Sequence, residues 1–114
     1  LAAPLKTAVL RRVRDERPLV RKAAASLLAR ACADESLARD AALQLSVDAA
    51  VGVRREALHA ADALLQAAGP AGAAHWIATV FPRTADPDNA LVQLAIELVH
   101  ARLLAPLLAP NELH

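Results

Sequence analysis

Aromatic residues, glycine and cysteine are all scarce in this sequence of 114 residues. It holds one Trp, one Phe, no Tyr, three Gly and one Cys, while alanine and leucine dominate. Strands draw on aromatic and β-branched residues, so this composition disfavours strands and favours helix throughout. A single cysteine cannot form an intrachain disulfide or a cysteine-based zinc site, which fits a reducing, intracellular setting. We therefore expect an all-α fold.

Long uninterrupted apolar runs are also missing. Each is broken by Arg, Asp, Gly or Pro before it reaches the roughly 20 residues that a membrane-spanning helix needs. The first residues lack the layout of a signal peptide. Because the sequence starts at Leu1 and ends soon after the apolar run 105–110, we expect a soluble segment, residues 1–114, of a longer protein, with no membrane partner.

Three segments of the chain repeat one pattern. Residues 15–24 read DERPLVRKAA, residues 48–57 read DAAVGVRREA and residues 86–95 read DPDNALVQLA. In each, an Asp is followed five residues later by Val or Leu and nine residues later by Ala. The spacings of 33 and 38 residues are typical of repeats that each hold two helices. We expect repeats at about 1–33, 34–68 and 69–105.

Proline, glycine and aspartate divide the repeats into helices. Pro18 suits the first turn of a helix, and Asp86-Pro87 is expected to be a cap followed by a first-turn proline. Gly69-Pro70 is expected to end one helix and open the next, and Gly52 to fall in a turn. The expected helices are roughly 5–14, 18–33, 36–47, 50–68, 70–81 and 88–105.

Apolar residues recur at helical spacing in the second helix of each repeat and predict the face that packs in the core. They are Val20, Ala24, Leu27, Leu28 and Ala31, then Val53, Ala57, Ala60, Ala61 and Leu64, then Leu91, Ala95, Leu98 and Val99. Many of them are alanines, which bury little area but allow helices to approach closely. Stability should therefore depend on contacts between neighbouring repeats.

An Asp followed at five and six residues by Val-Arg, and then by a helix rich in Ala and Leu, resembles the HEAT repeat. The resemblance implies a right-handed α-solenoid of about three helical hairpins, roughly six helices, in which Asp and Arg of successive repeats bond across the stack. The signature residues are Asp15, Arg21, Asp48, Arg54 and Asp86. Val92 stands where a third Arg would be. We therefore expect two such Asp–Arg bonds between repeats, each of which is called a rung below.

A narrower resemblance is to the D-type HEAT subunits of condensin II. It rests on RVRDER at residues 12–17, VRKA at 20–23, VRREAL at 53–58, and Trp76 followed by Val92-Gln93. It implies a non-catalytic scaffold, a regulatory subunit in mitotic chromosome condensation, located in the nucleus on chromosomes. The implied partners are the kleisin and SMC subunits of that complex and the backbone of double-stranded DNA, with no cofactor and no small-molecule substrate.

Positive charge is concentrated at the start of the chain. Residues 1–30 carry eight basic and two acidic side chains, whereas the rest carry five basic and ten acidic ones. Candidate contacts to DNA phosphates or to an acidic partner are Arg11, Arg12, Arg14, Arg17, Lys22 and Arg55. No aromatic residues interleave these charges, so any DNA contact would be to the backbone. The alternative is a solvated face, in which Arg21 pairs with Asp15 and Arg17 pairs with Glu16 or remains free.

Patterns for catalysis and metal binding are weak. His59 and Asp62 share a helix face at a spacing of three residues, as do Glu97 and His100. The sequence lacks, however, the His-Glu dipeptides that mark the di-iron hydroxylases of the HEAT type. Cys32 has no neighbouring His to activate it, and the serines lack a nucleophile elbow. We expect no catalytic residue, no metal site and no cofactor, so that the chain is not an enzyme.

Trp76 and Phe81 supply the aromatic side chains, five residues apart. A structural anchor is the first interpretation of Trp76, and an exposed residue that contacts a peptide is the alternative. Two further functions stay open for the chain. One is a generic HEAT adaptor that binds acidic peptides in transport or signalling, and the other is a HEAT-type enzyme such as a hydroxylase or a bilin lyase.

Overall fold

Helices account for nearly all of the described chain, which in this computed structural model comprises residues 3–32, 36–68 and 72–108. The first pair is α1 (Ala3–Arg12) with α2 (Pro18–Ala31), and the second is α3 (Ser36–Leu45) with α4 (Val51–Ala68). The third is α5 (Ala73–Val80), followed by a 3-10 segment, η2 (Phe81–Ala85), with α6 (Asn89–Val99). A π-helical segment, η3 (His100–Leu104), and α7 (Ala105–Leu108) continue α6. The described residues contain no strand, so the all-α prediction is confirmed.

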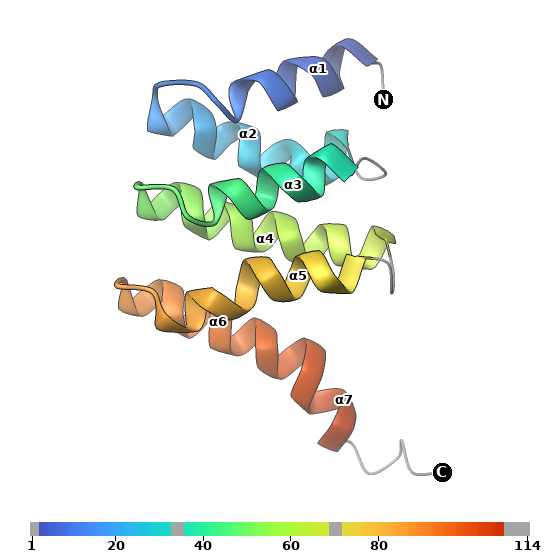
Figure 1. Ribbon diagram of the computed structural model, residues 1–114, viewed down its shortest axis with the longest axis vertical. Helices are drawn as coiled ribbons and strands as arrows, with labels where there is room; N and C mark the ends of the chain where they lie inside the picture. Colours follow the sequence, from blue (N-terminus) through green and yellow to red (C-terminus); the bar gives the residue numbers. More distant parts are fainter. Residues whose placement is uncertain (1–2, 33–35, 69–71, 109–114) are drawn as a thin grey trace.

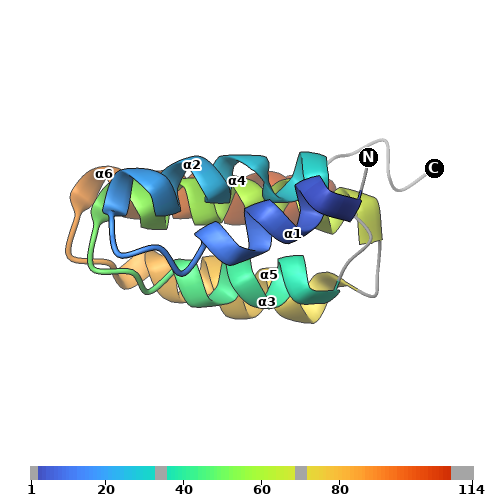
Figure 2. The same cartoon turned by 90° about the horizontal axis from the view of Figure 1, so that it is seen from above.

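The helix pairs follow one another along the longest axis of the molecule, with α1 at one end and α7 at the other (Figure 1). Seen from above, α2, α4 and α6 form one layer and α3 and α5 a second one (Figure 2). Helix α1 departs from this order, because it lies between the two layers rather than directly over α3. The principal extents of 47 × 33 × 16 Å describe a flat, elongated body.

Two turn positions expected from the sequence are wrong. Asp88, not Asp86, caps α6, because its Oδ2 accepts a hydrogen bond from the Leu91 N–H at 3.0 Å, and Pro87 lies before the helix. Gly52 lies in the first turn of α4 rather than between helices, and it packs beside the side chain of Lys22. Pro18 opens α2 as expected. The Gly69-Pro70 prediction falls outside the described residues.

The core lies between the two layers. Its largest fully buried apolar side chains are Val53, Leu28, Leu58, Leu64, Trp76, Val80 and Leu91. All of the expected inward residues of α4 are buried, which confirms the helical periodicity there. The inward assignment of Leu27 is wrong: it sits about 100° around the helix from Leu28, at the edge of the apolar face, and is exposed.

The last helix exposes most of its apolar residues. The run Asn89–Leu107 is 19 residues long, has a mean hydropathy of 1.5 and is 11% buried, so by length and composition alone it could cross a membrane. The uninterrupted apolar runs are short, as expected, but a run that includes Glu97, Arg102 and Pro106 still reaches this length and mean hydropathy. Two features tie the run to the rest of the molecule. Leu91 and Ala95 are fully buried, and Arg102 bonds to Asp62 on α4.

Candidate functional site

Arg21 joins the first helix pair to the second. Its Nε and Nη2 donate to the two carboxylate oxygens of Asp48 at 2.7 and 3.0 Å. Its Nη1 donates to the backbone oxygens of Asp15 and Glu16, at 2.9 and 3.0 Å, in the turn that precedes its own helix. One guanidinium therefore holds the turn of its own pair and the aspartate of the next pair.

Arg54 repeats this arrangement one pair further along. Its Nε and Nη2 donate to Asp86 at 2.9 and 3.1 Å, and its Nη1 donates to the backbone oxygens of Asp48 and Ala49. The described residues thus contain two such rungs, Arg21–Asp48 and Arg54–Asp86. Val92 occupies the equivalent place in α6 and cannot form a third.

Each aspartate of the repeat signature also shapes its own turn. Oδ1 of Asp15, Asp48 and Asp86 accepts the backbone N–H two residues later, at 2.8, 2.9 and 2.9 Å. Such a bond closes a short turn, and the two oxygens of each carboxylate still accept bonds from an arginine. The sequence predicted these three residues as a set from spacing alone.

The carboxyl groups of the two rungs, those of Asp48 and Asp86, are stabilised in their ionised forms. Burial raises the pKa of Asp48, but the hydrogen bonds from Arg21 and from the Ala50 N–H outweigh it, so that the pKa lies below its ordinary value. Burial likewise opposes ionisation of Asp86, and the Asp88 N–H and Arg54 together lower its pKa. Arg83 adds a further bond to Asp86 at 2.8 Å.

The first aspartate has no rung and pairs locally. Arg17 binds Asp15 through Nε and Nη2 at 3.0 and 3.1 Å, and this pair lowers the pKa of Asp15 to about 2. The ion pairs expected for a solvated face are therefore wrong. Arg17 does not pair with Glu16, and Arg21 bonds to the backbone oxygen of Asp15 but not to its carboxylate. Arg21 is directed instead to the next pair.

The remaining candidate basic residues lie at the surface. Arg11, Arg12, Arg14 and Lys22 are exposed, and Arg55 is partly exposed. Arg12 donates to the Ala8 carbonyl of its own helix at 3.2 Å. Arg11 and Arg14 make no side-chain hydrogen bond or ion pair with any described residue. Lys22 is likewise exposed without a side-chain hydrogen bond or ion pair, so Arg11 at the end of α1, Arg14 in the turn after it and Lys22 on α2 are the exposed candidates that are not already committed.

An open groove of about 900 Å³ lies between α1 and α3. Arg11 and Arg14 are on the α1 side of it, and Leu37 and Asp40 are on the α3 side. Its other lining residues are Thr7, Leu10, Asp15, Glu16, Ala41 and Gln44. The sequence did not predict this groove, because it results from the displaced position of α1.

Trp76 is buried, with 2% of its surface exposed, and its Nε1 donates to Oδ1 of Asp62 at 3.1 Å. The structural-anchor interpretation of Trp76 is confirmed, and the peptide-contact interpretation is wrong because the ring is inside the molecule.

Arg102 also binds Asp62, at 2.8 and 2.7 Å, and this bond lowers the pKa of that carboxyl. Phe81 is exposed. The sequence missed the role of Arg102 because its partner lies 40 residues away.

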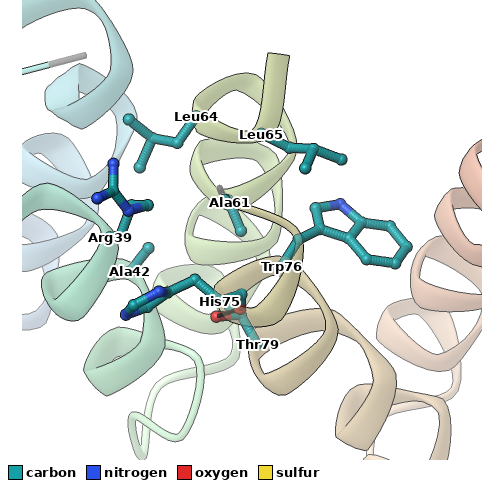
Figure 3. A pocket seen from close by; sticks show the side chains of 9 residues that line it. Arg39, Ala42, Ala61, Leu64, Leu65, His75, Trp76 and Thr79 are labelled. Atoms are coloured by element: carbon teal, nitrogen blue, oxygen red, sulfur yellow. Dashed lines mark hydrogen bonds between the residues drawn. The ribbon is translucent and has the colours of Figure 1, made fainter. Parts of the chain in front are cut away.

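A small cavity of about 10 Å³ lies where α3, α4 and α5 meet. Arg39 and His75 point to one side of it, whereas the indole of Trp76 points away from His75 (Figure 3). Nε2 of His75 lies 2.9 Å from Oδ1 of Asp40, which links α5 to α3. A space of this size holds about one water molecule and excludes a substrate or an organic cofactor.

Groups that would hold a metal ion are not found among residues 3–32, 36–68 and 72–108, since no three His, Cys, Asp or Glu side chains come together there. Asp62, which shares a helix face with His59, is bound by Trp76 and Arg102 instead. Cys32 is buried at the end of α2. Ser26 donates its hydroxyl to a carbonyl of its own helix, and Ser46, just after α3, donates to the Leu43 carbonyl of that helix.

The chain is thus an all-α protein in which consecutive helix pairs are joined by partly buried arginine–aspartate bonds. No protein-family model matches it, and no curated protein or solved structure shows significant similarity to it.

Proposed function

We propose that this chain is a non-catalytic scaffold of the HEAT type, a right-handed α-solenoid segment that presents helix surfaces to macromolecular partners. The observation that carries the proposal is the repeated rung. Arg21 and Arg54 bind the next aspartate and their own turn with the same atoms, at equivalent positions of successive helix pairs. A bond that recurs in this way belongs to a repeat architecture, in which function lies on the surface.

The assembly that we propose is condensin II, with the chain acting as part of its D-type HEAT subunit in mitotic chromosome condensation in the nucleus. The resemblance of RVRDER at 12–17 and VRREAL at 53–58 supports this assignment. The partners would be the kleisin, the SMC pair and the DNA backbone. Arg11 and Arg14 support a contact with an anionic partner, because both are exposed and unpaired among the described residues.

Affinity purification of the full-length protein, followed by mass spectrometry, tests the assembly. We expect SMC and kleisin subunits to be recovered together with it. Their absence, with other proteins recovered in stoichiometric amounts, would favour the second candidate, a HEAT adaptor in transport or signalling. Iron bound to the purified protein would instead favour an enzyme of the HEAT type.

A salt series tests the DNA contact. Binding to a duplex of random sequence should weaken with salt, with a slope that reflects the number of phosphates neutralised. The triple variant Arg11→Ala/Arg12→Ala/Arg14→Ala should have a shallower slope than the wild type. Identical slopes would exclude these arginines from the contact.

A further inference from the structure

The third helix pair, at one end of the stack, exposes large apolar side chains on both of its helices (Figure 1). Ile77 in α5, Phe81 in η2 and Ile96 in α6 are 45%, 48% and 47% exposed. Leu104 and Leu107 extend the apolar surface along η3 and α7. Apolar residues that gather on one surface in this way mark a contact site more often than scattered ones do.

Ile77 and Ile96 identify this surface as the stacking face of the third pair. The second and third pairs are 38 residues apart along the chain, so Ile96 corresponds to Leu58 and Ile77 corresponds to Arg39. Leu58 is fully buried, and Arg39 lines the cavity where α3, α4 and α5 meet. The surface therefore continues the type of contact that joins the second pair to the third.

The stacking face has little charge. The exposed residues of α5 and η2 include no charged side chain: they are Ala74, Ile77, Ala78, Phe81, Pro82 and Ala85. Glu97 is the one exposed carboxylate in the described residues of α6, η3 and α7. It corresponds to His59, which stays exposed although the third pair follows α4, so Glu97 lies outside the contact. Two copies of this face can thus meet without like-charge repulsion.

The opposite end of the stack has a different character. The exposed residues of α1 and α2 include four cations, Arg11, Arg12, Lys22 and Arg30, and no carboxylate among those described. Two such ends would repel each other. Packing this end against the apolar face would remove cations from water without giving them a partner, which is costly. The charges therefore disfavour a head-to-tail contact between copies.

Val92 also bears on what covers the stacking face. A further helix pair with the repeat signature would present an aspartate, as the second and third pairs do to Arg21 and Arg54. Val92 cannot bind that carboxylate, and a buried carboxylate without a partner destabilises a contact. The face therefore fits an apolar surface that carries no such aspartate. Its own copy is one.

We propose that two copies of this chain associate through the stacking faces of their third helix pairs, around a two-fold axis. Such an interface is self-complementary, with Ile77, Phe81 and Ile96 of each copy covered by the other. The molecule measures 33 × 16 Å across its longest axis, so its end can bury several hundred Å² per copy, about the area of a small specific interface. Self-association goes beyond the proposed scaffold function and does not depend on the assembly.

Sedimentation equilibrium of the 114-residue chain tests the proposal. We expect the mass to rise from the 12.0 kDa of one chain to twice that value between about 1 µM and about 300 µM. It should rise no further, because a two-fold contact is used up in the dimer.

Ile96→Glu and Phe81→Glu should each weaken the dimer by about tenfold or more, since each would bury a charge without a partner. Both side chains are about half exposed in the single chain, so neither substitution removes a core residue. Leu19→Glu is the matched control: it makes a similar change at a residue of the opposite end that is 78% exposed, and it should leave the dimer within about twofold. Thermal melts at the lowest concentration report whether each variant is folded, and either test variant suffices if the other unfolds.

Four results would overturn the proposal. The first is a mass of one chain at every concentration. The second is a series of larger oligomers that Leu19→Glu and Ile96→Glu both weaken, which would show a head-to-tail contact. The third is a dimer that neither Ile96→Glu nor Phe81→Glu affects. The fourth is a chain that stays single but cosediments with phosphatidylcholine vesicles until Ile96→Glu is introduced, which would assign the face to lipid. None of these results bears on the recovery of SMC and kleisin subunits, which tests the assembly separately.

Discussion

Arg21 and Arg54 are each held by four hydrogen bonds, two to a carboxylate and two to backbone oxygens. The carboxylate of Asp86 is fully buried, and that of Asp48 is nearly so. A buried charge is costly when it loses its partner, because water does not replace the lost bonds. The arginines therefore matter for stability more than surface ion pairs do.

Arg54→Met should lower the free energy of unfolding by about 3 kcal/mol. The substitution removes the bidentate partner of Asp86 and the donor to the turn carbonyls of Asp48 and Ala49. Urea unfolding followed by circular dichroism measures the loss. Arg55→Met is the control: this neighbour belongs to neither rung, and its replacement should change the free energy by less than about 0.5 kcal/mol. Equal losses for both variants would contradict the role of the rung.

Acid should weaken the molecule through its bound aspartates. The pKa values of Asp48, Asp62 and Asp86 are all lowered in the folded protein. As pH falls, the unfolded chain takes up protons on these carboxyls first. Their contribution is therefore complete above the ordinary carboxyl pKa of about 3.9 and is lost as the pH falls through the lowered folded values.

Urea unfolding at about pH 7 and about pH 3 measures this loss. The double variant Asp48→Asn/Asp86→Asn should lose less stability between the two pH values than the wild type does, because two of the responsible groups no longer titrate. A loss as large as that of the wild type would mean that the dependence comes from other carboxyls.

At the scale of elements, equivalent positions of successive helices have different environments. Ala25, Leu58 and Ile96 each lie ten residues after the aspartate of their repeat. Ala25 and Leu58 are 0% exposed, whereas Ile96 is 47% exposed. In the stack, the α3–α4 pair follows α2 and the α5–α6 pair follows α4, whereas no described helix pair follows α6 (Figure 1). The repeat pattern alone predicts that all three residues are equally buried. Their exposure differs because the three helices hold different positions in the stack.

Leu58→Ala should cost about 2–4 kcal/mol of stability, since it removes a fully buried side chain and leaves a cavity. Ile96→Ala, at the equivalent position of α6, should cost less than about 1 kcal/mol, because its side chain is half exposed already. Chemical denaturation of the two variants measures both values. A large cost at Ile96 would show that another surface covers α6 in solution.

Asp62 on α4 anchors the C-terminal helix through polar bonds. Asp62 accepts bonds from Trp76 on α5 and from Arg102 in the π-helical segment, so that one carboxylate holds two later elements. A π-helical segment widens the helix by one residue locally and changes which side chains share a face. Arg102 occupies a position that corresponds to buried Leu64 in α4, and it reaches inward to Asp62.

At the scale of the whole molecule, the core is built from small side chains. Ten of the 21 buried apolar residues in the described parts of the chain are alanines. An alanine contributes less transfer free energy than a leucine because it removes less apolar surface from water. In a flat body 16 Å thick, few residues can be surrounded on all sides. Packing contacts between neighbouring helix pairs therefore supply much of the stability.

The isolated chain should unfold at a modest temperature, with a midpoint below about 65 °C. Differential scanning calorimetry, or the fluorescence of Trp76 on heating, measures the midpoint. The expectation rests on the alanine-rich core and on the uncovered face of α6. A cooperative transition well above that temperature would show that the rungs and the packing of the layers suffice without further neighbours.

The sequence by itself determined the helices and the residues of the repeat signature. Composition excluded strands, and the spacing of Asp15, Asp48 and Asp86 located the three pairs. The expected helix bounds lie within three residues of those observed when α6, η3 and α7 are taken as one continuous helix. These features are local or periodic, so that a pattern along the chain contains them. The replacement of Arg by Val92 likewise predicted where the rungs end.

The tertiary structure alone decided what lies at the surface. Burial of Trp76 against Asp62, the bond from Arg102 across 40 residues, and the displacement of α1 that opens the groove all depend on how helices pack in three dimensions. A list of basic residues could not show that Arg17 is bound to Asp15 while Arg11 and Arg14 are unpaired. Pairing depends on distance in space, and the sequence records only separation along the chain.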